Sequence, residues 1–240
     1  VPRVEQDPIS GLLLEGAAPD LADAVGAEHR VDLHRHVAPL RRDRLEDAEA
    51  GIDRDHVEQP RLGVVADTHI PDRLRTLPPR LFDVLRGVDL ILHAGDICHP
   101  RVLAELGALA PVVAVRGNRD VLYRAHWTLP LDRIVEIGGV RLGLTHGHGG
   151  LWGYVGEKLL YYTVGFRLER FNAAVRTRFN FTGVQAIVFG HSHVPVNTRR
   201  DGVLMFNPGS VGPEYGTRLG ATVGILTISG NTASGVIVQC

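Results

Sequence analysis

From residue 61 onward, short apolar runs alternate with segments in which apolar residues recur at helical spacing. The apolar runs predict strands at residues 62–66, 88–93 and 112–116. Helices are predicted between them at 78–87, with proline at its start, and at 99–109. This order predicts parallel strands joined by right-handed crossovers. A polar loop then follows each strand at one edge of the sheet, where open α/β sheets place their ligands.

The second half of the chain has the pattern of a hairpin and further strands. The hairpin is predicted from residues 133–137 and 140–145, with Gly138-Gly139 at its turn. Further strands are predicted at residues 185–189, 203–206, 221–228 and 234–238, the last two as closing antiparallel strands. The pattern as a whole predicts a domain of the α/β class.

Residues 152–181 lie between these strands and hold much of the aromatic content of the chain. Helical spacing relates Leu160, Val164, Leu168 and Phe171. The aromatic residues are Trp152, Tyr154, Tyr161, Tyr162, Phe166, Phe171, Phe179 and Phe181. Three interpretations stay open: a helix packed on the sheet, a lid beside a site, or a surface that forms a homo-oligomer through residues 152–181. The basic residues of this segment either attract phosphate or form a solvated helix face; they are Arg167, Arg170, Arg176 and Arg178.

The first sixty residues differ in composition from the rest of the chain. They contain no aromatic residue, are rich in Asp, Glu, Arg and His, and include Pro2, Pro8, Pro19 and Pro39. The apolar content of this segment is too low to form a core of its own. Residues 1–60 are therefore expected to be a weakly structured N-terminal extension to a domain at 61–240. Its histidines match no ligand spacing and are interpreted as solvated surface residues; they are His29, His34, His36 and His56.

Composition and charge narrow the class of protein. The formal net charge is -1 and no polybasic block is present, so binding to nucleic acid is not expected. The chain contains no stretch of about 18 uninterrupted apolar residues, so no membrane helix is predicted. The start of the chain does not have the pattern of a secretory signal. The two cysteines, Cys98 and Cys240, have neither metal-binding nor redox spacing. A reduced, cytoplasmic protein is expected.

Polar side chains with oxygen or nitrogen donors follow five of the predicted strands; they are Asp67, His69, Asp96, Asn118, His146, His191 and His193. Taken singly, each motif has an ordinary explanation, because Gly-Asp and Gly-Asn are common turns and a lone histidine is commonly a surface residue. Their coincidence at five strand ends indicates a site. A set without thiolates suits Mn, Fe, Co, Ni or Zn. Seven donors are too many for one tetrahedral ion but suit two ions about 4 Å apart that share a carboxylate.

The ordered motifs carry a family resemblance. They are Asp67-Thr68-His69, Gly95-Asp96, Gly117-Asn118-Arg119-Asp120, Thr145-His146-Gly147-His148, Gly190-His191-Ser192-His193 and Asn207-Pro208-Gly209-Ser210. This set resembles the calcineurin-like metallophosphoesterase superfamily, and within it the small, capless bacterial phosphodiesterases. The resemblance covers about residues 61 to 238. It implies a four-layer α/β/β/α sandwich of two mixed β-sheets flanked by helices, with a dinuclear metal centre at one edge of the sheets.

The resemblance also implies a role for each donor. Asp67, His69 and His193 would hold the first metal, Asp96 would bridge, and Asn118, His146 and His191 would hold the second. Two divalent ions, manganese first and Fe, Ni, Co or Zn as alternatives, would produce a bridging hydroxide that attacks phosphorus in line with the leaving oxygen.

Four residues are predicted to take part in catalysis: Asn118, Arg119, Asp120 and His148. Many phosphoprotein phosphatases carry a histidine directly after the asparagine, where it can protonate the leaving group. Arg119 occupies that position here and, because arginine is a poor proton donor, is expected to clamp a phosphate oxygen. His148 is either an alternative acid or phosphate contact, or a residue that orients a ligand by a hydrogen bond. Asp120 is expected to orient a ligand, Arg119 or both.

The function predicted from the resemblance is a metal-dependent hydrolase, and in particular a phosphodiesterase acting on a small phosphate ester such as a nucleotide-like compound. A phosphomonoesterase with the same chemistry is an alternative. A catalytically weak scaffold is another, because a related eukaryotic trafficking subunit uses this fold chiefly for protein contacts. The complete set of seven donors favours the enzyme, since a scaffold has no need of them.

Overall fold

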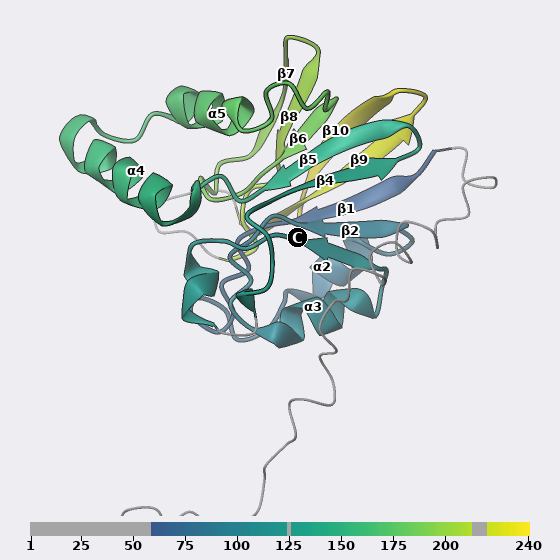
Figure 1. Cartoon of the computed structure of the whole chain (residues 1–240). Coiled ribbons are helices and arrows are strands. Elements are labelled where there is room, and N and C mark those ends of the chain that lie inside the picture. Colours follow the sequence, from purple (N-terminus) through teal and green to yellow (C-terminus); the bar gives the residue numbers. More distant parts are fainter. Residues whose placement is uncertain (1–58, 124–125, 213–219) are drawn as a thin grey trace, which may run out of the picture. The chain divides into compact units, whose positions relative to one another are not determined.

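The computed structural model describes residues 59–123, 126–212 and 220–240. The described strands form two five-stranded mixed sheets (Figure 1). The predicted N-terminal extension lies almost wholly outside the described residues. Among the described residues, no helix is both long and apolar enough to cross a bilayer.

The first sheet has the strand order β10-β9-β1-β2-β3. Its strands are β1 (Arg61–Val65), β2 (Leu90–His93), β3 (Val112–Ala114), β9 (Thr222–Ser229) and β10 (Thr232–Gln239). The parallel pairing of β1 with β2 and of β2 with β3 confirms the prediction from the alternation of strands and helices. The hairpin of β9 and β10 is antiparallel, also as predicted, and β9 pairs with β1.

The second sheet has the order β4-β5-β6-β8-β7. Its strands are β4 (Asp132–Ile137), β5 (Val140–Thr145), β6 (Ala186–Val188), β7 (Val196–Arg200) and β8 (Val203–Asn207). The predicted hairpin of β4 and β5 is confirmed. Sequence patterning missed β7, because four of its five side chains are exposed at the sheet edge and the strand has no apolar alternation.

Three apolar clusters separate four layers. The central cluster lies between the sheets, with Val64 and Leu92 from the first sheet and Leu142 and Phe206 from the second. Phe206 fits there because β9 and β10 present glycines to it. A Cβ on Gly224 would lie 2.4 Å from the ring. The predicted four-layer sandwich is confirmed.

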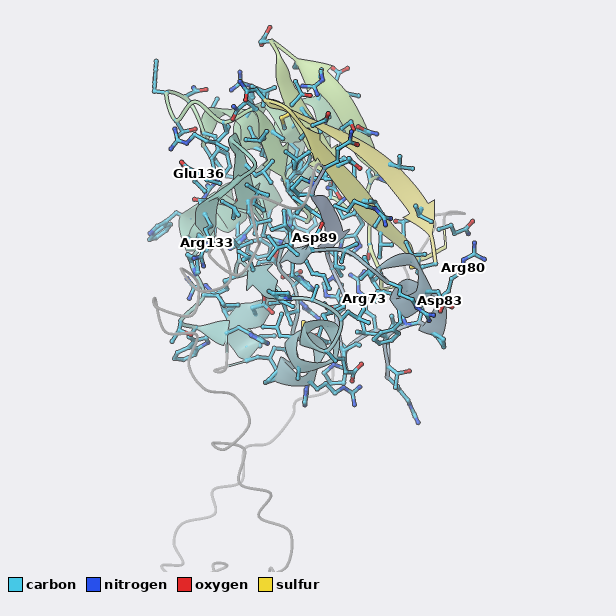
Figure 2. The ribbon with its side chains drawn as sticks, turned by 90° about the vertical axis from the view of Figure 1, so that its right-hand side faces the viewer. Arg73, Arg80, Asp83, Asp89, Arg133 and Glu136 are labelled. Atoms are coloured by element: carbon cyan, nitrogen blue, oxygen red, sulfur yellow. The ribbon has the colours of Figure 1, made fainter. Side chains whose placement is uncertain are left out.

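The helices α2 (Pro79–Val84) and α3 (Pro100–Gly107) cover the outer face of the first sheet. They bury Leu81, Leu85, Val102 and Leu106 against that sheet. The other side of α2 carries Arg80 and Asp83, whose side chains are exposed (Figure 2). Both helices begin with proline, as expected where a helix needs no backbone donor.

The segment 152–181 forms two helices, α4 (Gly150–Val164) and α5 (Leu168–Thr177). Gly165 separates them, with a left-handed φ of 77°. The helical prediction for this segment is confirmed, but Leu160 and Val164 do not continue the apolar face of Leu168 and Phe171, because they lie on a different helix. Phe171, Val175 and Phe179 pack on the second sheet, whereas α4 extends beyond it with Trp152, Leu159 and Tyr162 exposed (Figure 1).

Candidate metal centre

The site lies where β1, β2 and β3 of the first sheet and β5 and β6 of the second reach their carboxyl ends. All seven predicted donors come from the loops that follow these strands, and the structure brings them together. Asp67, His69, Asp96 and His146 are buried, and the side chain of His193 is only 7% exposed.

Asp67, His69 and His193 form one ligand group, whose donor atoms all lie within 4.8 Å of one another. The Nε2 of His193 lies 3.2 Å from Asp67 Oδ1 and 3.2 Å from the Nε2 of His69. Asp67 Oδ1 is buried and faces both rings, with His69 Nε2 at 3.7 Å, while Asp67 Oδ2 accepts a hydrogen bond from the backbone N–H of His191. A buried carboxylate oxygen facing two imidazoles fits a divalent cation.

Asn118, His146 and His191 form a second group. The Nδ1 of His146 lies 2.7 Å from the carbonyl oxygen of Ala94, so the neutral ring carries its proton there. Its Nε2 then presents a lone pair, which faces Asn118 Oδ1 at 3.0 Å and His191 Nδ1 at 3.2 Å. Lone pairs that converge in this way favour a cation between them.

Asp96 lies between the two groups. Its Oδ2 is 3.7 Å from His69 Nε2, and its Oδ1 is 3.5 Å from His146 Nε2. Asp67 is also close to both groups, since one of its oxygens lies within 4.8 Å of donor atoms of Asp96 and His146. The contacts of Asp96 with both groups support the predicted bridging role, whereas Asp67 has only Oδ1 available for an ion.

The backbone at the site is strained. Five of the predicted donors have left-handed φ angles between 49° and 68°; they are Asp67, His69, Asp96, His191 and His193. Residues other than glycine rarely adopt this conformation, and clusters of such residues are typical of functional sites. Gly117 is required for a different reason, because a Cβ there would lie 2.1 Å from Asp96 Oδ1.

The pKa values of Asp96 and Asp67 are shifted in opposite directions. Burial raises the pKa of Asp96 well above its usual range, and the negative charges of Asp67 and Asp120 add to this effect. Burial would also raise the pKa of Asp67, but the charge and hydrogen bond of His193, with the rings of His146 and His69, hold it below its usual range. A divalent cation beside Asp96 would offset this accumulated negative charge.

The predicted catalytic residues occupy three different positions around these groups. Arg119 donates its backbone N–H to Asp96 Oδ1, while its guanidinium contacts Asp72 at 3.3 Å. Asp120 is fully buried and accepts hydrogen bonds of 2.7 Å from the backbone N–H groups of Cys98 and Gly117. It thereby ties together the loops that carry Asp96 and Asn118 and does not itself contact a donor side chain through a recorded bond.

His148 lies beside the second group, with its ring centroid 5.3 Å from that of His146 and 6.3 Å from that of His191. Burial lowers the pKa of His148 to about 4, and the neighbouring His191 and Arg178 act in the same direction. A ring that is neutral at pH 7 is suited to accepting or donating one hydrogen bond rather than to carrying a charge. The choice between its predicted roles stays open.

Two further residues support the site. Asn207 is fully buried, and its Nδ2 donates to the carbonyl oxygen of Gly190 and to Ser192 Oγ, which holds the loop of His191 and His193. It belongs to a motif recognised in the sequence, but no role was assigned to it there. Arg73 Nη1 lies 3.3 Å from His193 Nδ1, and no sequence signal identifies that contact across 120 residues.

The folding stability is expected to depend on pH through His93, the last residue of β2. Complete burial lowers the pKa of His93 from 6.5 to about 3, although the charge of Asp67 acts in the opposite direction. Between these values the unfolded chain binds a proton at His93 that the folded chain does not, so stability is full above pH 6.5 and falls as the pH drops.

The loss at His93 approaches about 1.4 kcal/mol per pH unit. We expect urea denaturation of metal-free protein at several pH values below 6.5 to show this dependence, and His93→Gln to reduce its slope. Equal slopes in the two proteins would contradict the prediction.

The comparisons with known proteins agree with this geometry. Residues 61–231 match the family model of the calcineurin-like phosphoesterase superfamily domain. A probable metallophosphoesterase from Methanothermobacter thermautotrophicus is 35% identical over 178 residues, which are 74% of this chain and 91% of that protein.

Two solved structures support the fold. A single-residue variant of Vps29 from Entamoeba histolytica is 20% identical with a TM-score of 0.54, and the match covers 75% of this chain and 99% of that one. A predicted phosphoesterase from Streptococcus pneumoniae is 22% identical with a TM-score of 0.52, covering 76% of this chain and 91% of that one.

Proposed function

The chain belongs to the calcineurin-like phosphoesterase superfamily, and from this premise we propose that it is a phosphodiesterase that depends on two divalent ions. The family and the two ligand groups support the broader description, a metal-dependent phosphoesterase. The observation that carries the proposal is the convergence of seven oxygen and nitrogen donors from five strand ends, with Asp96 in contact with both groups.

The seven donors would bind the two ions in two sets. Asp67, His69 and His193 would hold one ion, Asn118, His146 and His191 the other, and Asp96 would contribute to both. When bound, such ions supply Lewis acidity, which lowers the pKa of the attacking water and offsets charge on the phosphoryl oxygens. Manganese is the ion proposed first, with Fe, Ni, Co and Zn as alternatives.

The side chains around the donors would position the substrate. The side chain of Arg119 is 46% exposed, and its guanidinium, which contacts Asp72, would clamp a phosphoryl oxygen. It cannot protonate the leaving group. Esters with acidic alcohols, which leave without a proton, are therefore expected to be the better substrates.

The preference for diesters rests on the resemblance of the motif set to small capless phosphodiesterases. A phosphomonoesterase remains the first alternative. The scaffold remains the second, because Vps29 shares the fold. A scaffold has no requirement for strained backbone at five donors, so the strain favours the enzyme.

The test uses purified protein stripped of metal with a chelator. We expect hydrolysis of bis(p-nitrophenyl) phosphate only after Mn²⁺ is added back, with a kcat/KM above that for p-nitrophenyl phosphate. An undiminished rate after complete metal removal would overturn the metal-dependent proposal. A higher kcat/KM for the monoester would overturn only the preference for diesters.

Two further proposals concern the cellular location and the oligomeric state of the protein. We propose a cytoplasmic location, supported by the two free thiols of Cys98 and Cys240. Formation of a homo-oligomer through residues 152–181 also stays a prediction. Its support is the exposure of Leu159 and Tyr162 on α4, at 66% and 80%.

A further inference from the structure

Two arginines from different loops lie beside the donors. Arg73 belongs to the loop after β1, and Arg119 follows Asn118 in the loop after β3. Nη1 of Arg73 lies 3.3 Å from Nδ1 of His193, and the backbone N–H of Arg119 donates to Asp96 Oδ1 at 2.8 Å. Both arginines are exposed, so a dissolved molecule can reach them.

The charges of both arginines act on the donors. Burial lowers the pKa of His69 to about 4, Asp67 opposes this effect, and the positive charges of Arg73 and Arg119 add to it. The two cations are therefore close enough to the ligand group of Asp67, His69 and His193 to attract an anion that is bound there.

The carboxylate of Asp72 is directed toward Arg119. Its Oδ2 lies 3.3 Å from Nη2 of Arg119, and its Oδ1 accepts a hydrogen bond of 2.6 Å from the hydroxyl of Tyr123. Asp72 is thereby held by two residues of the segment that follows Asn118. Arg73 contacts the site elsewhere, at His193, so the two arginines can act on different parts of one ligand.

An ion held by His193 would change what Arg73 can bind. Nε2 of His193 faces Asp67 Oδ1 and His69 Nε2, so Nε2 is the atom that would hold the ion. A neutral ring that binds an ion through Nε2 carries its proton on Nδ1. Nδ1 and the guanidinium would then both be donors, so Nη1 of Arg73 has to direct its hydrogens to an acceptor other than His193. An acidic group of a bound substrate is such an acceptor.

We propose that Arg73 binds a second acidic group of the substrate, and that the substrate is a phosphate ester with this acid close to its reactive phosphoryl group. The inference rests on the proposed function, because it assumes that the phosphoryl group lies at the donors. Arg119 would hold an oxygen of that phosphoryl group, and Arg73 would hold the second acid. The two arginines therefore have different roles, which a pair of probes can separate.

The test is a calorimetric titration of Mn²⁺-loaded protein with two probes of nearly equal shape. Phosphonoacetate carries a carboxylate one carbon away from its phosphonate, and phosphonoacetamide carries a neutral amide in the same place. We expect phosphonoacetate to bind about fivefold more tightly, the upper range for an exposed ion pair. This advantage should become smaller at high salt.

Substitutions test whether Arg73 causes the difference. Arg73→Gln should remove the advantage of phosphonoacetate and leave the affinity for phosphonoacetamide unchanged, whereas Arg73→Lys should restore part of the advantage. Arg119→Gln should weaken the binding of both probes by a similar factor. Arg75→Gln is the matched control, because it removes the same charge from an exposed position of the same loop, and it should keep the full advantage.

Four results would each overturn the inference: no binding of either probe, equal affinities of the wild type for both, an advantage that survives in Arg73→Gln, or an equal loss for both probes in that variant. The last result would mean that Arg73 only supports His193.

The same preparations are assayed with bis(p-nitrophenyl) phosphate. Hydrolysis without an advantage for phosphonoacetate would overturn the role of Arg73 and leave the proposed function intact. Selective binding without hydrolysis would overturn the proposed function and leave the role of Arg73 in binding the second acid intact.

Discussion

Asp96→Asn is expected to reduce kcat by about 10³-fold or more, the largest catalytic effect of any single substitution at the site. Asp96 is 2% exposed, and its two oxygens contact His69 in one ligand group and His146 in the other. An amide keeps the geometry and can still accept the backbone hydrogen bond of Arg119. It removes the negative charge that the two groups share.

The stability of this variant separates catalysis from folding. Burial and the charges of Asp67 and Asp120 raise the pKa of Asp96, so its carboxylate is costly in the metal-free protein. Metal-free Asp96→Asn should therefore be at least as stable as the wild type in urea denaturation. Asp83→Asn is the matched control, since that carboxylate is exposed on α2 and pairs only with Arg86 among recorded contacts. A variant of Asp96 with nearly full turnover would contradict the bridging role.

Asp120→Ala is expected to have the largest effect on stability. Asp120 accepts hydrogen bonds from the backbone N–H groups of Cys98 and Gly117, and its removal leaves both donors without that partner. Each buried donor left without a partner costs about 1–3 kcal/mol, so a loss of about 2–6 kcal/mol is expected. Activity should fall as well, because the loops of Asp96 and Asn118 lose their connection.

The neighbouring residue provides the comparison for Asp120. Arg119→Ala removes an exposed guanidinium whose contact with Asp72 contributes at most about 1 kcal/mol. It should leave the midpoint of urea denaturation almost unchanged while raising KM. If Asp120→Ala unfolds at the same urea concentration as the wild type, the structural role inferred for the Asp120 carboxylate is contradicted.

Much of the site could be predicted because its donors follow apolar strands, and buried strands have a clear signal in sequence. Because β1, β2 and β3 pair in parallel, the loops that follow them were expected to meet at one edge of the first sheet. The directions of the Asp67 and His69 side chains were not predictable, however, because β1 ends at Val65 and both residues have left-handed φ angles. Asp and His are enriched among residues with such angles but adopt them only occasionally, so residue type alone does not identify this conformation.

Features that depend on tertiary contacts were not predictable. The edge strand β7 has exposed polar side chains, so pairing with β8 alone defines it. The role of Asn207 depends on a loop seventeen residues away, and the contact of Arg73 with His193 joins distant parts of the chain. The division of residues 152–181 into α4 and α5 at Gly165 was not predicted, because the helical spacing of the apolar residues continues across that glycine.

The metal content of the protein tests the two-ion site most directly. Protein loaded with Mn²⁺, desalted and measured by inductively coupled plasma mass spectrometry is expected to contain two ions per chain. The combined substitution Asn118→Ala and His146→Ala removes donors of the second group only and should leave one ion, held by Asp67, His69 and His193. One ion per chain in the fully active wild type would contradict a centre built from both groups.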